Sequence, residues 1–154
     1  MTERLKIISG GQTGVDRAAL DAAIEAGLPH GGTCPVGRAA EDGVIDDRYD
    51  LIETESADPI IRTRLNIADA DATLILAQGD LAGGTRQAAE YVEHLGRALL
   101  IVDPFTDSAA EEIGEWLSGR RWRILSIGGP RESEHPGIYE KARGVLGEVF
   151  ARLP

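Results

Sequence analysis

The chain has 154 residues, of which 42% are hydrophobic and 27% are charged, and its net charge is -10. This length suits one core, so residues 1–154 are predicted to form a single domain. The acidic balance argues against a nucleic-acid polymer as partner, because Lys and Arg contacts to phosphate hold such partners. The sequence has no 20-residue apolar stretch of the kind that predicts a membrane span, and no apolar leader follows Met1. Cys34 is the only cysteine. We therefore expect a cytoplasmic protein without a membrane partner.

Along the chain, short apolar runs alternate with longer segments of helical spacing. Strands are predicted at residues 5–9, 30–33, 51–55, 72–77, 98–102 and 123–127, and helices at residues 15–26, 60–70, 85–95, 108–117 and 138–152. This alternation is typical of βαβ units and predicts the α/β class with a mostly parallel sheet. The runs at 74–76 and 99–102 are apolar without alternation, so both are expected to be central strands covered on both faces.

The segment 9–20, SGGQTGVDRAAL, follows the first apolar run and leads into a helix. Its three glycines let backbone amides approach a ligand, Thr13 adds a hydroxyl, and the helix near Val15 aims its positive end at a bound anion. Arg17 could add positive charge. The segment is neither a Walker A loop nor the dinucleotide fingerprint GxGxxG. In the alternative interpretation, Thr13 and Asp16 form a capping box that satisfies the first amides of the helix.

A second glycine pair lies in segment 79–90, GDLAGGTRQAAE, again between an apolar run and a helix. Two such turns converge on one ligand if they flank the switch point of a doubly wound sheet. The alternative is an ordinary turn in which Thr85 caps the helix while Arg86 and Glu90 form a solvated i,i+4 pair. In the segment RTRLN that follows residue 61, Arg62 could reach toward an anion, although the composition favours a solvated face.

The stretch 34–50, CPVGRAAEDGVIDDRYD, has mixed charge and no clear period. A loop of this length in a compact domain is usually functional or disordered. It leaves the carboxyl end of a strand, where the ligands of open α/β sheets lie, so we expect it to be a lid. His30 and Cys34 have metal-like spacing but make half a site at best, so no protein-bound metal is predicted. Trp116 and Trp122 are expected to pack in the core or against another subunit.

Four motifs in this order resemble the molybdenum-cofactor carrier family: SGGQTGVDRAALDAA, CPVGRAAEDG, RTRLNIADADATLIL and GGT. This family belongs to the Rossmann-like group that also contains the lonely-guy phosphoribohydrolases, once mislabelled lysine decarboxylases. The resemblance spans residues 7–90. It implies a Rossmann-like three-layer α/β/α domain, often a homo-oligomer, that holds a phosphorylated small molecule such as molybdenum cofactor at its glycine loops.

The resemblance also implies a set of binding residues carried on these motifs. They are Gly10, Gly11, Thr13, Gly14, Asp16 and Arg17; Gly37, Arg38, Glu41 and Asp42 in the lid; Arg62, Thr63 and Asn66; and Gly83, Gly84 and Thr85. The phosphoribohydrolases carry a glutamate three residues after the threonine of their glycine motif. Here position 88 is alanine and the first glutamate after Thr85 is Glu90. On a helix, positions 88 and 90 point in directions about 200° apart, so Glu90 does not simply take the place of that glutamate.

The leading hypothesis is a small-molecule binding protein, a carrier or sensor for molybdenum cofactor (a pterin phosphate) or a nucleotide. Three arginines would neutralise the phosphate: Arg17, Arg38 and Arg62. The alternative is an enzyme of the lonely-guy type that hydrolyses the N-glycosidic bond of a nucleotide. Such chemistry needs a carboxylate near the ribose, for which the candidates are Asp16, Glu41, Asp42 and Glu90.

A structural subunit whose glycine loops are relics is the third hypothesis. The last predicted helix, residues 138–152, carries an apolar stripe of Val145, Leu146, Val149 and Phe150. This stripe could cover the sheet of its own subunit or join it to a second copy. The sequence leaves both arrangements open, and self-association is expected from the family resemblance.

Overall fold

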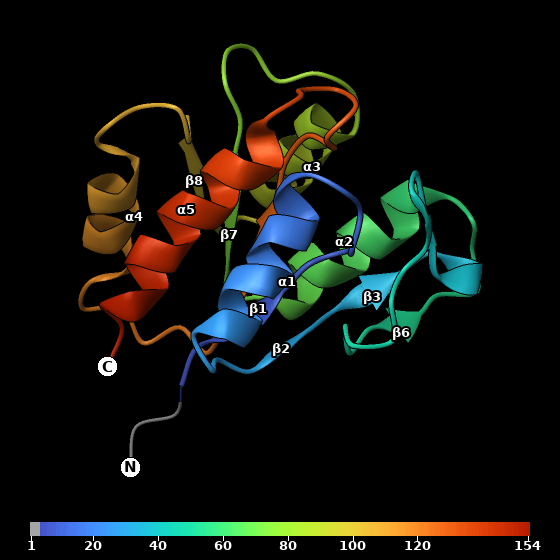
Figure 1. The fold of residues 1–154 in the computed structure, drawn as a ribbon, viewed down its shortest axis with the longest axis horizontal. Coiled ribbons are helices and arrows are strands. Elements are labelled where there is room, and N and C mark those ends of the chain that lie inside the picture. The colour runs from blue at the N-terminus through green and yellow to red at the C-terminus, as the bar shows by residue number, and fades with distance from the viewer. Residues whose placement is uncertain (1–3) are drawn as a thin grey trace.

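The fold is built on a central parallel sheet. The structure is a computed structural model that describes residues 4–154 (Figure 1). Its main strands are β1 (Lys6–Ile8), β2 (His30–Gly31), β7 (Ala72–Leu76), β8 (Ala98–Val102) and β9 (Ile124–Gly128). They hydrogen-bond in the order β2-β1-β9-β7-β8, and every pair is parallel. The predicted α/β class with a parallel sheet is therefore confirmed.

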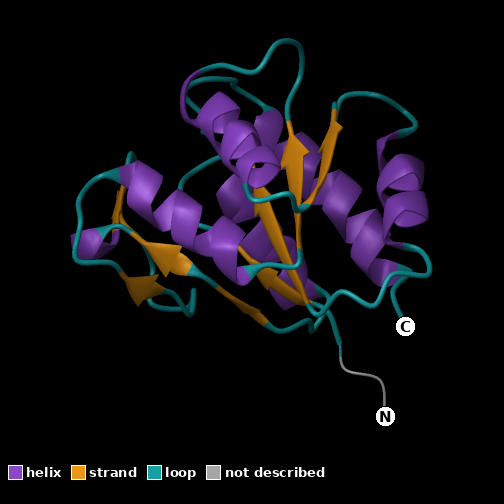
Figure 2. Ribbon diagram, turned by 180° about the vertical axis from the view of Figure 1, so that it is seen from behind, coloured by secondary structure: helices purple, strands orange, loops and turns teal. Residues whose placement is uncertain are grey.

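Helices cover both faces of this sheet (Figures 1 and 2). One face carries α1 (Val15–Glu25), α4 (Ala109–Leu117) and α5 (Ile138–Ala151), and the other carries α2 (Pro59–Asp69) and α3 (Gly83–His94). Side chains along β7 alternate between the two: Leu74 and Leu76 join the cluster under α1, α4 and α5, whereas Ile75 packs against Ala89 of α3. All of β7 is buried, as predicted for a central strand.

By contrast, β8 lies at an edge of the sheet. The prediction that residues 99–102 are covered on both faces is wrong, because Ile101 exposes 45% of its surface. An apolar run does not distinguish a central strand from an edge strand, since crossover connections set the strand order. The predicted strand 30–33 is also divided at Gly32 into β2 and β3 (Thr33–Cys34). β3 pairs with β6 (Ile52–Glu53) in a separate small sheet.

The strand order has a simple relation to that of nucleotide-binding folds. The last strand, β9, lies between β1 and β7. If the five main strands are counted from β9, the order becomes 3-2-1-4-5, which is the order of the doubly wound fold. In such a sheet ligands bind at the carboxyl ends of the strands where the winding direction reverses. That point here lies between β9 and β7, beside the end of β1.

The long stretch after Cys34 forms an ordered substructure. It contains a short 3-10 turn at Val36–Arg38 and the hairpin of β4 (Ala39–Ala40) and β5 (Gly43–Val44). The Arg38 guanidinium donates hydrogen bonds of 2.7–3.3 Å to four backbone carbonyls of this stretch and its end: those of Ile45, Asp46, Tyr49 and Leu51. Ile45, Tyr49 and Leu51 also pack with Leu20 of α1 and the buried thiol of Cys34.

The last helix covers the sheet of its own chain. Leu146, Val149 and Phe150 of α5 are buried in the main cluster beside α1, so the own-subunit interpretation of the stripe is confirmed. Trp116 and Trp122 pack on each other, with ring centroids 4.7 Å apart, and against the same cluster. Among residues 4–154 there is no helix that is long and apolar enough to cross a membrane.

Candidate functional site

A cavity of about 340 Å³ lies at the carboxyl ends of β1, β9 and β7, between the sheet and helices α2 and α3. This is the place that the strand order indicates for a ligand. Its size is at the lower end of the range of small-molecule sites. The cavity brings together seven of the binding residues named from the sequence: Gly10, Asp16, Arg62, Thr63, Asn66, Gly84 and Thr85.

A buried ion pair stands at one side of this cavity. Arg62 Nη1 donates to Asp16 Oδ2 at 2.7 Å, and the two side chains expose only 12% and 8% of their surface. A Cβ atom on Gly10 would lie 1.8 Å from Arg62 Nη1, so the glycine leaves the space that the guanidinium occupies. The interpretation of Arg62 as part of a solvated face is therefore wrong, because α2 turns this side chain toward the sheet.

The ion pair is electrostatically balanced. Burial raises the pKa of the Asp16 carboxyl, and the nearby Arg62 guanidinium opposes that rise by favouring the charged form. Arg62 Nε is buried and has no hydrogen-bond partner among residues 4–154. Asn66 also lines the cavity, but its amide is engaged with Thr33: it accepts from the Thr33 amide at 2.8 Å and donates to the Thr33 carbonyl at 3.1 Å.

The positive end of α3 opens on the same cavity. The helix begins at Gly83, its N-cap is Ala82, and no side chain caps it. Thr85 lies inside the helix, so its predicted role as a cap is wrong. Gly84 and Thr85 line the cavity, and the uncapped first turn leaves backbone amides that suit an anion. Arg86 and Glu90 form the predicted exposed pair at 3.1 Å, and Glu90 does not line the cavity.

The first glycine loop has a different environment from the one expected. The N-cap of α1 is Gly14 without a side-chain cap, so the predicted capping box of Thr13 and Asp16 is wrong. The Val15 amide donates to the Pro130 carbonyl at 3.2 Å, and a Cβ atom on Gly14 would lie 2.3 Å from that oxygen. The start of α1 is thus closed by the chain that follows β9. Gly11, Thr13, Gly14 and Arg17 do not line the cavity.

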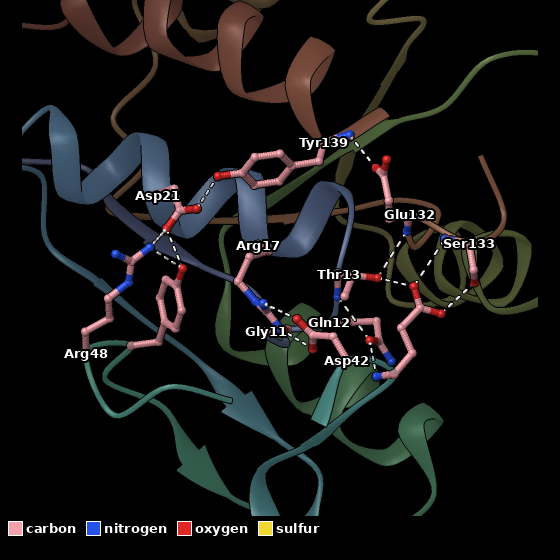
Figure 3. A network of polar contacts seen from close by, with 12 residues as sticks. Gly11, Gln12, Thr13, Arg17, Asp21, Asp42, Arg48, Glu132, Ser133 and Tyr139 are labelled. Atoms are coloured by element: carbon pink, nitrogen blue, oxygen red, sulfur yellow. Dashed lines mark hydrogen bonds and ion pairs between the residues drawn. The ribbon is translucent and has the colours of Figure 1, made fainter. Parts of the chain in front are cut away.

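Two acidic side chains of the expected lid, Glu41 and Asp42, bond to Thr13 of this loop and to residues near it (Figure 3). Glu41 accepts from the Thr13 hydroxyl and, at 2.5 and 3.1 Å, from the Ser133 hydroxyl and amide. Arg17 donates two bonds of 3.0 and 3.1 Å to Asp42. These donors lower the pKa of both carboxyls.

None of residues 34–50 lines the cavity, so in this structure the stretch does not act as its lid. Gly37 and Arg38 are therefore apart from the other predicted binding residues. Glu41 and Asp42, two of the four carboxylates considered for catalysis, are also outside. With Glu90 exposed on α3, Asp16 is the one of those four that lines the cavity.

Sequence reasoning missed several residues of the cavity. The largest group lies in β9 and in the chain just after it: Ser126, Ile127, Gly128, Gly129, Arg131 and Glu134. A Cβ atom on Gly129 would lie 2.3 Å from the Leu76 carbonyl, so the backbones approach closely here. The signal was present, since SIGGPR is a third glycine pair after an apolar run. The other missed residues are Ser9, Gln12, Asp58, Pro59, Ile60, Ile67, Thr73, Ile75, Gln87 and Ala88.

Comparison with known proteins identifies the family of this chain. Residues 7–150 match the model of the circularly permutated YpsA SLOG family. A solved structure from Syntrophus aciditrophicus, named "putative molybdenum carrier protein", is 40% identical. The match covers 97% of this chain and 96% of that chain, with a TM-score of 0.89. A search of curated proteins found no match. The resemblance predicted from the four motifs is confirmed, and the chain belongs to the circularly permutated YpsA SLOG family.

Proposed function

We propose that the protein is a carrier or sensor that binds a phosphorylated small molecule in the cavity between α2, α3 and the sheet. The observation that carries this proposal is the uncapped N-terminus of α3, with Gly84 and Thr85 on the wall of the 340 Å³ cavity. A helix N-terminus binds phosphate through its free amides and its positive dipole end. The proposal places the phosphate there, at the mouth of the cavity.

Arg131 is the cation that suits this phosphate. It lines the same cavity, it exposes 49% of its side chain, and its known partners are Glu134 and Glu41 at the surface. Arg17 and Arg38 are committed to Asp42 and to backbone carbonyls respectively, so the proposal does not use them. Arg62 is paired with Asp16 and serves to shape the cavity wall.

Molybdenum cofactor, a pterin phosphate, is the ligand that the proposal favours, and a nucleotide is the second choice. The name of the Syntrophus aciditrophicus protein supports the first choice. The chemistry of the cavity fits both, since each ligand joins a flat ring to a phosphate. Cytoplasmic location and self-association stay predictions from the sequence.

The test is to denature the freshly purified protein and identify any released small molecule by mass spectrometry. A pterin phosphate, with or without molybdenum, supports the carrier. A nucleotide supports a sensor. Binding of pterin phosphates and nucleotides is then measured by calorimetry on the wild-type protein and on a Gly84→Asp variant, whose carboxylate repels a phosphate at the start of α3. Equal affinities for the two proteins would place the phosphate elsewhere.

One observation favours the alternative of N-glycosidic hydrolysis: the buried Asp16 carboxylate lines the cavity, where a ribose would lie. A carboxylate at that place could orient water or polarise the sugar. The expected result for an enzyme is release of free base from a panel of nucleoside monophosphates, lost in Asp16→Asn. If the folded wild-type protein released no free base from any nucleotide of the panel, hydrolysis would be excluded and only the binding function would remain.

A further inference from the structure

Two hydroxyl groups lie side by side on the floor of the cavity. Thr73 of β7 and Ser126 of β9 are cross-strand partners in the sheet, so their side chains share one face about 5 Å apart. Both line the cavity, and they expose only 3% and 5% of their surface. Within residues 4–154 no hydrogen bond joins either hydroxyl to the protein, and both oxygens are accessible from the cavity, because Arg62 Nε is the one enclosed side-chain N or O atom left there without a partner.

Their neighbours on the cavity wall are different. Ser9 donates to the Asp16 carbonyl at 2.8 Å, and the Asn66 amide is bonded to Thr33. The Ser9 hydroxyl and the Asn66 amide thus have partners in the protein, whereas the two hydroxyls on the floor do not. Central parallel strands normally carry Val, Ile or Leu at such positions. A hydroxyl that opens on the cavity and has no partner in the protein is free to bond to a ligand. These two positions therefore fit a role in contacting a bound molecule.

The charges and apolar surfaces of the cavity indicate which part of a ligand reaches the floor. Arg62 is neutralised there by Asp16, so the floor offers no uncompensated positive charge for a phosphate. The walls are apolar where Ile67, Ile75 and Ala88 face the cavity. Apolar walls suit the faces of a flat ring, and hydroxyls that both donate and accept suit its polar edge.

We propose that Thr73 and Ser126 select the ligand by hydrogen bonding to the polar edge of a heteroaromatic ring, one that carries a ring carbonyl beside an N–H group. The phosphate of the same molecule then lies at the start of α3. This inference rests on the proposed function and adds to it the class of ring and the residues that recognise it.

The test compares four probes by calorimetry: inorganic phosphate, guanosine monophosphate, 6-hydroxymethylpterin phosphate and purine riboside monophosphate, whose ring lacks the carbonyl and amino groups. The proteins are wild type, Thr73→Val with Ser126→Ala, and the control Ser118→Ala at the end of α4, outside the cavity. The wild type should bind a carbonyl-bearing ring more tightly than purine riboside monophosphate. The double variant should lose about 10- to 100-fold of that affinity, as expected for two hydrogen bonds. Its affinity for inorganic phosphate should stay within about twofold of the wild-type value. Thr73→Ser with Ser126 unchanged keeps both hydroxyls, so it should bind the ring probes as the wild type does.

A second readout separates recognition from a structural role. Because the hydroxyls have no partner in the protein, the ligand-free double variant should unfold at the same temperature as the wild type or a higher one. Unchanged affinity for the ring probes would mean that the hydroxyls contact only water, and the inference would be overturned. Equal losses for ring probes and inorganic phosphate would also overturn it, since the phosphate would then lie on the floor.

The failure of the proposed function looks different with a fifth probe, unphosphorylated 6-hydroxymethylpterin. If unphosphorylated 6-hydroxymethylpterin bound as tightly as its phosphate and still depended on both hydroxyls, the phosphate site would be wrong and the floor assignment would hold. If no probe bound to the folded wild-type protein, both would be wrong.

Discussion

The three glycines of the first loop serve different purposes at the level of single residues. Gly11 and Gly14 have φ angles of +80° and +77°, which side chains rarely adopt, so they are required by the path of the chain. Gly10 has an ordinary backbone, and its missing side chain makes room for the Arg62 guanidinium. Of the three, only Gly10 reaches the cavity. The loop therefore both turns the chain and shapes the site, through different glycines.

Gly10→Ala is expected to displace Arg62 from Asp16, because the new Cβ atom would overlap the guanidinium. The carboxylate would then lose its buried partner. We expect the free energy of unfolding to fall by about 1–3 kcal/mol. Urea denaturation measures it, with Gly144→Ala as the control. Gly144 lies within α5, and a Cβ atom there meets nothing within 4 Å. This control should be stabilised by roughly 0.5–1 kcal/mol. Equal effects of the two variants would show that Arg62 is not displaced.

Glu41 makes the attachment of the 34–50 stretch sensitive to acid. Hydrogen bonds from Ser133 and Thr13 hold its pKa below the ordinary value of 4.5, so its contribution to stability is complete above that pH. The contribution is lost as the pH falls through the lower folded-state pKa. Glu41→Gln should lower the melting temperature at pH 7 by about 2–4 °C and make it less dependent on pH below 5. Glu148→Gln, an exposed site on α5, is the control. The same acid dependence in both variants would contradict the assignment.

At the level of elements, the sequence predicted most helices and strands but not their neighbours. The helical spacing of 15–26 and the apolar run at 72–77 were sufficient, because a helix or a central strand is defined by local composition. The edge position of β8 and the pairing of β3 with β6 depend on chain crossovers that composition does not encode.

The candidate site shows the same limit. Gly84, of the glycine pair after β7, could be placed on the cavity from the sequence alone, whereas Gly83 does not line it and the burial of Arg62 could not be predicted. Arginine is usually exposed, and only the contact with Asp16, 46 residues away in the chain, makes its burial favourable. Arg17 and Arg38 were expected to bind a phosphate because the sequence does not show what they bond to. In the structure Arg17 bonds to Asp42, and Arg38 bonds to backbone carbonyls.

Helix α1, helix α5 and the 34–50 stretch are joined by one buried carboxylate, Asp21 (Figure 3). It accepts hydrogen bonds from Arg48 at 2.7 Å, from the Tyr49 hydroxyl at 2.6 Å and from the Tyr139 hydroxyl. Burial, aided by Asp21, raises the pKa of Tyr139 to about 12. Its contribution to stability is thus present below pH 10 and is lost as the pH rises through 12.

Tyr139→Phe should lower the free energy of unfolding at pH 8 by about 1–2 kcal/mol, because Asp21 loses a donor inside the protein. In an alkaline titration followed by ultraviolet absorbance, the step near pH 12 should disappear. Tyr91→Phe is the control, since Tyr91 stacks on His94 at the surface of α3 and has no part in the Asp21 network. A titration of Tyr139→Phe that kept the step near pH 12 would assign that step to another tyrosine.

At the level of the whole molecule, β9 is the last strand along the chain but lies in the middle of the sheet. The order of the strands in the sheet therefore differs from their order in the sequence. Counting from β9 gives the doubly wound order 3-2-1-4-5, and the cavity lies where that order reverses. The two ends of the described chain lie on the same side of the molecule (Figures 1 and 2). The site thus depends on which strands are neighbours and not on where the chain begins.

This view predicts that a rearranged chain keeps its fold and its cavity. We would open the chain at Gly119, between α4 and β9, and join Pro154 to Arg4 through a flexible Gly/Ser linker of about eight residues. Loop-closure costs grow slowly with length, so the free energy of unfolding should stay within about 1–2 kcal/mol of the natural chain. Urea denaturation measures this, and calorimetry should find unchanged ligand affinity.

A second chain, opened between Gln12 and Thr13, should be much less stable, because Gln12 accepts bonds from the amides of Thr13 and Glu41 across that break. If the chain opened at Gly119 failed to fold while the second folded, the order of strands along the chain would matter more than their neighbours in the sheet.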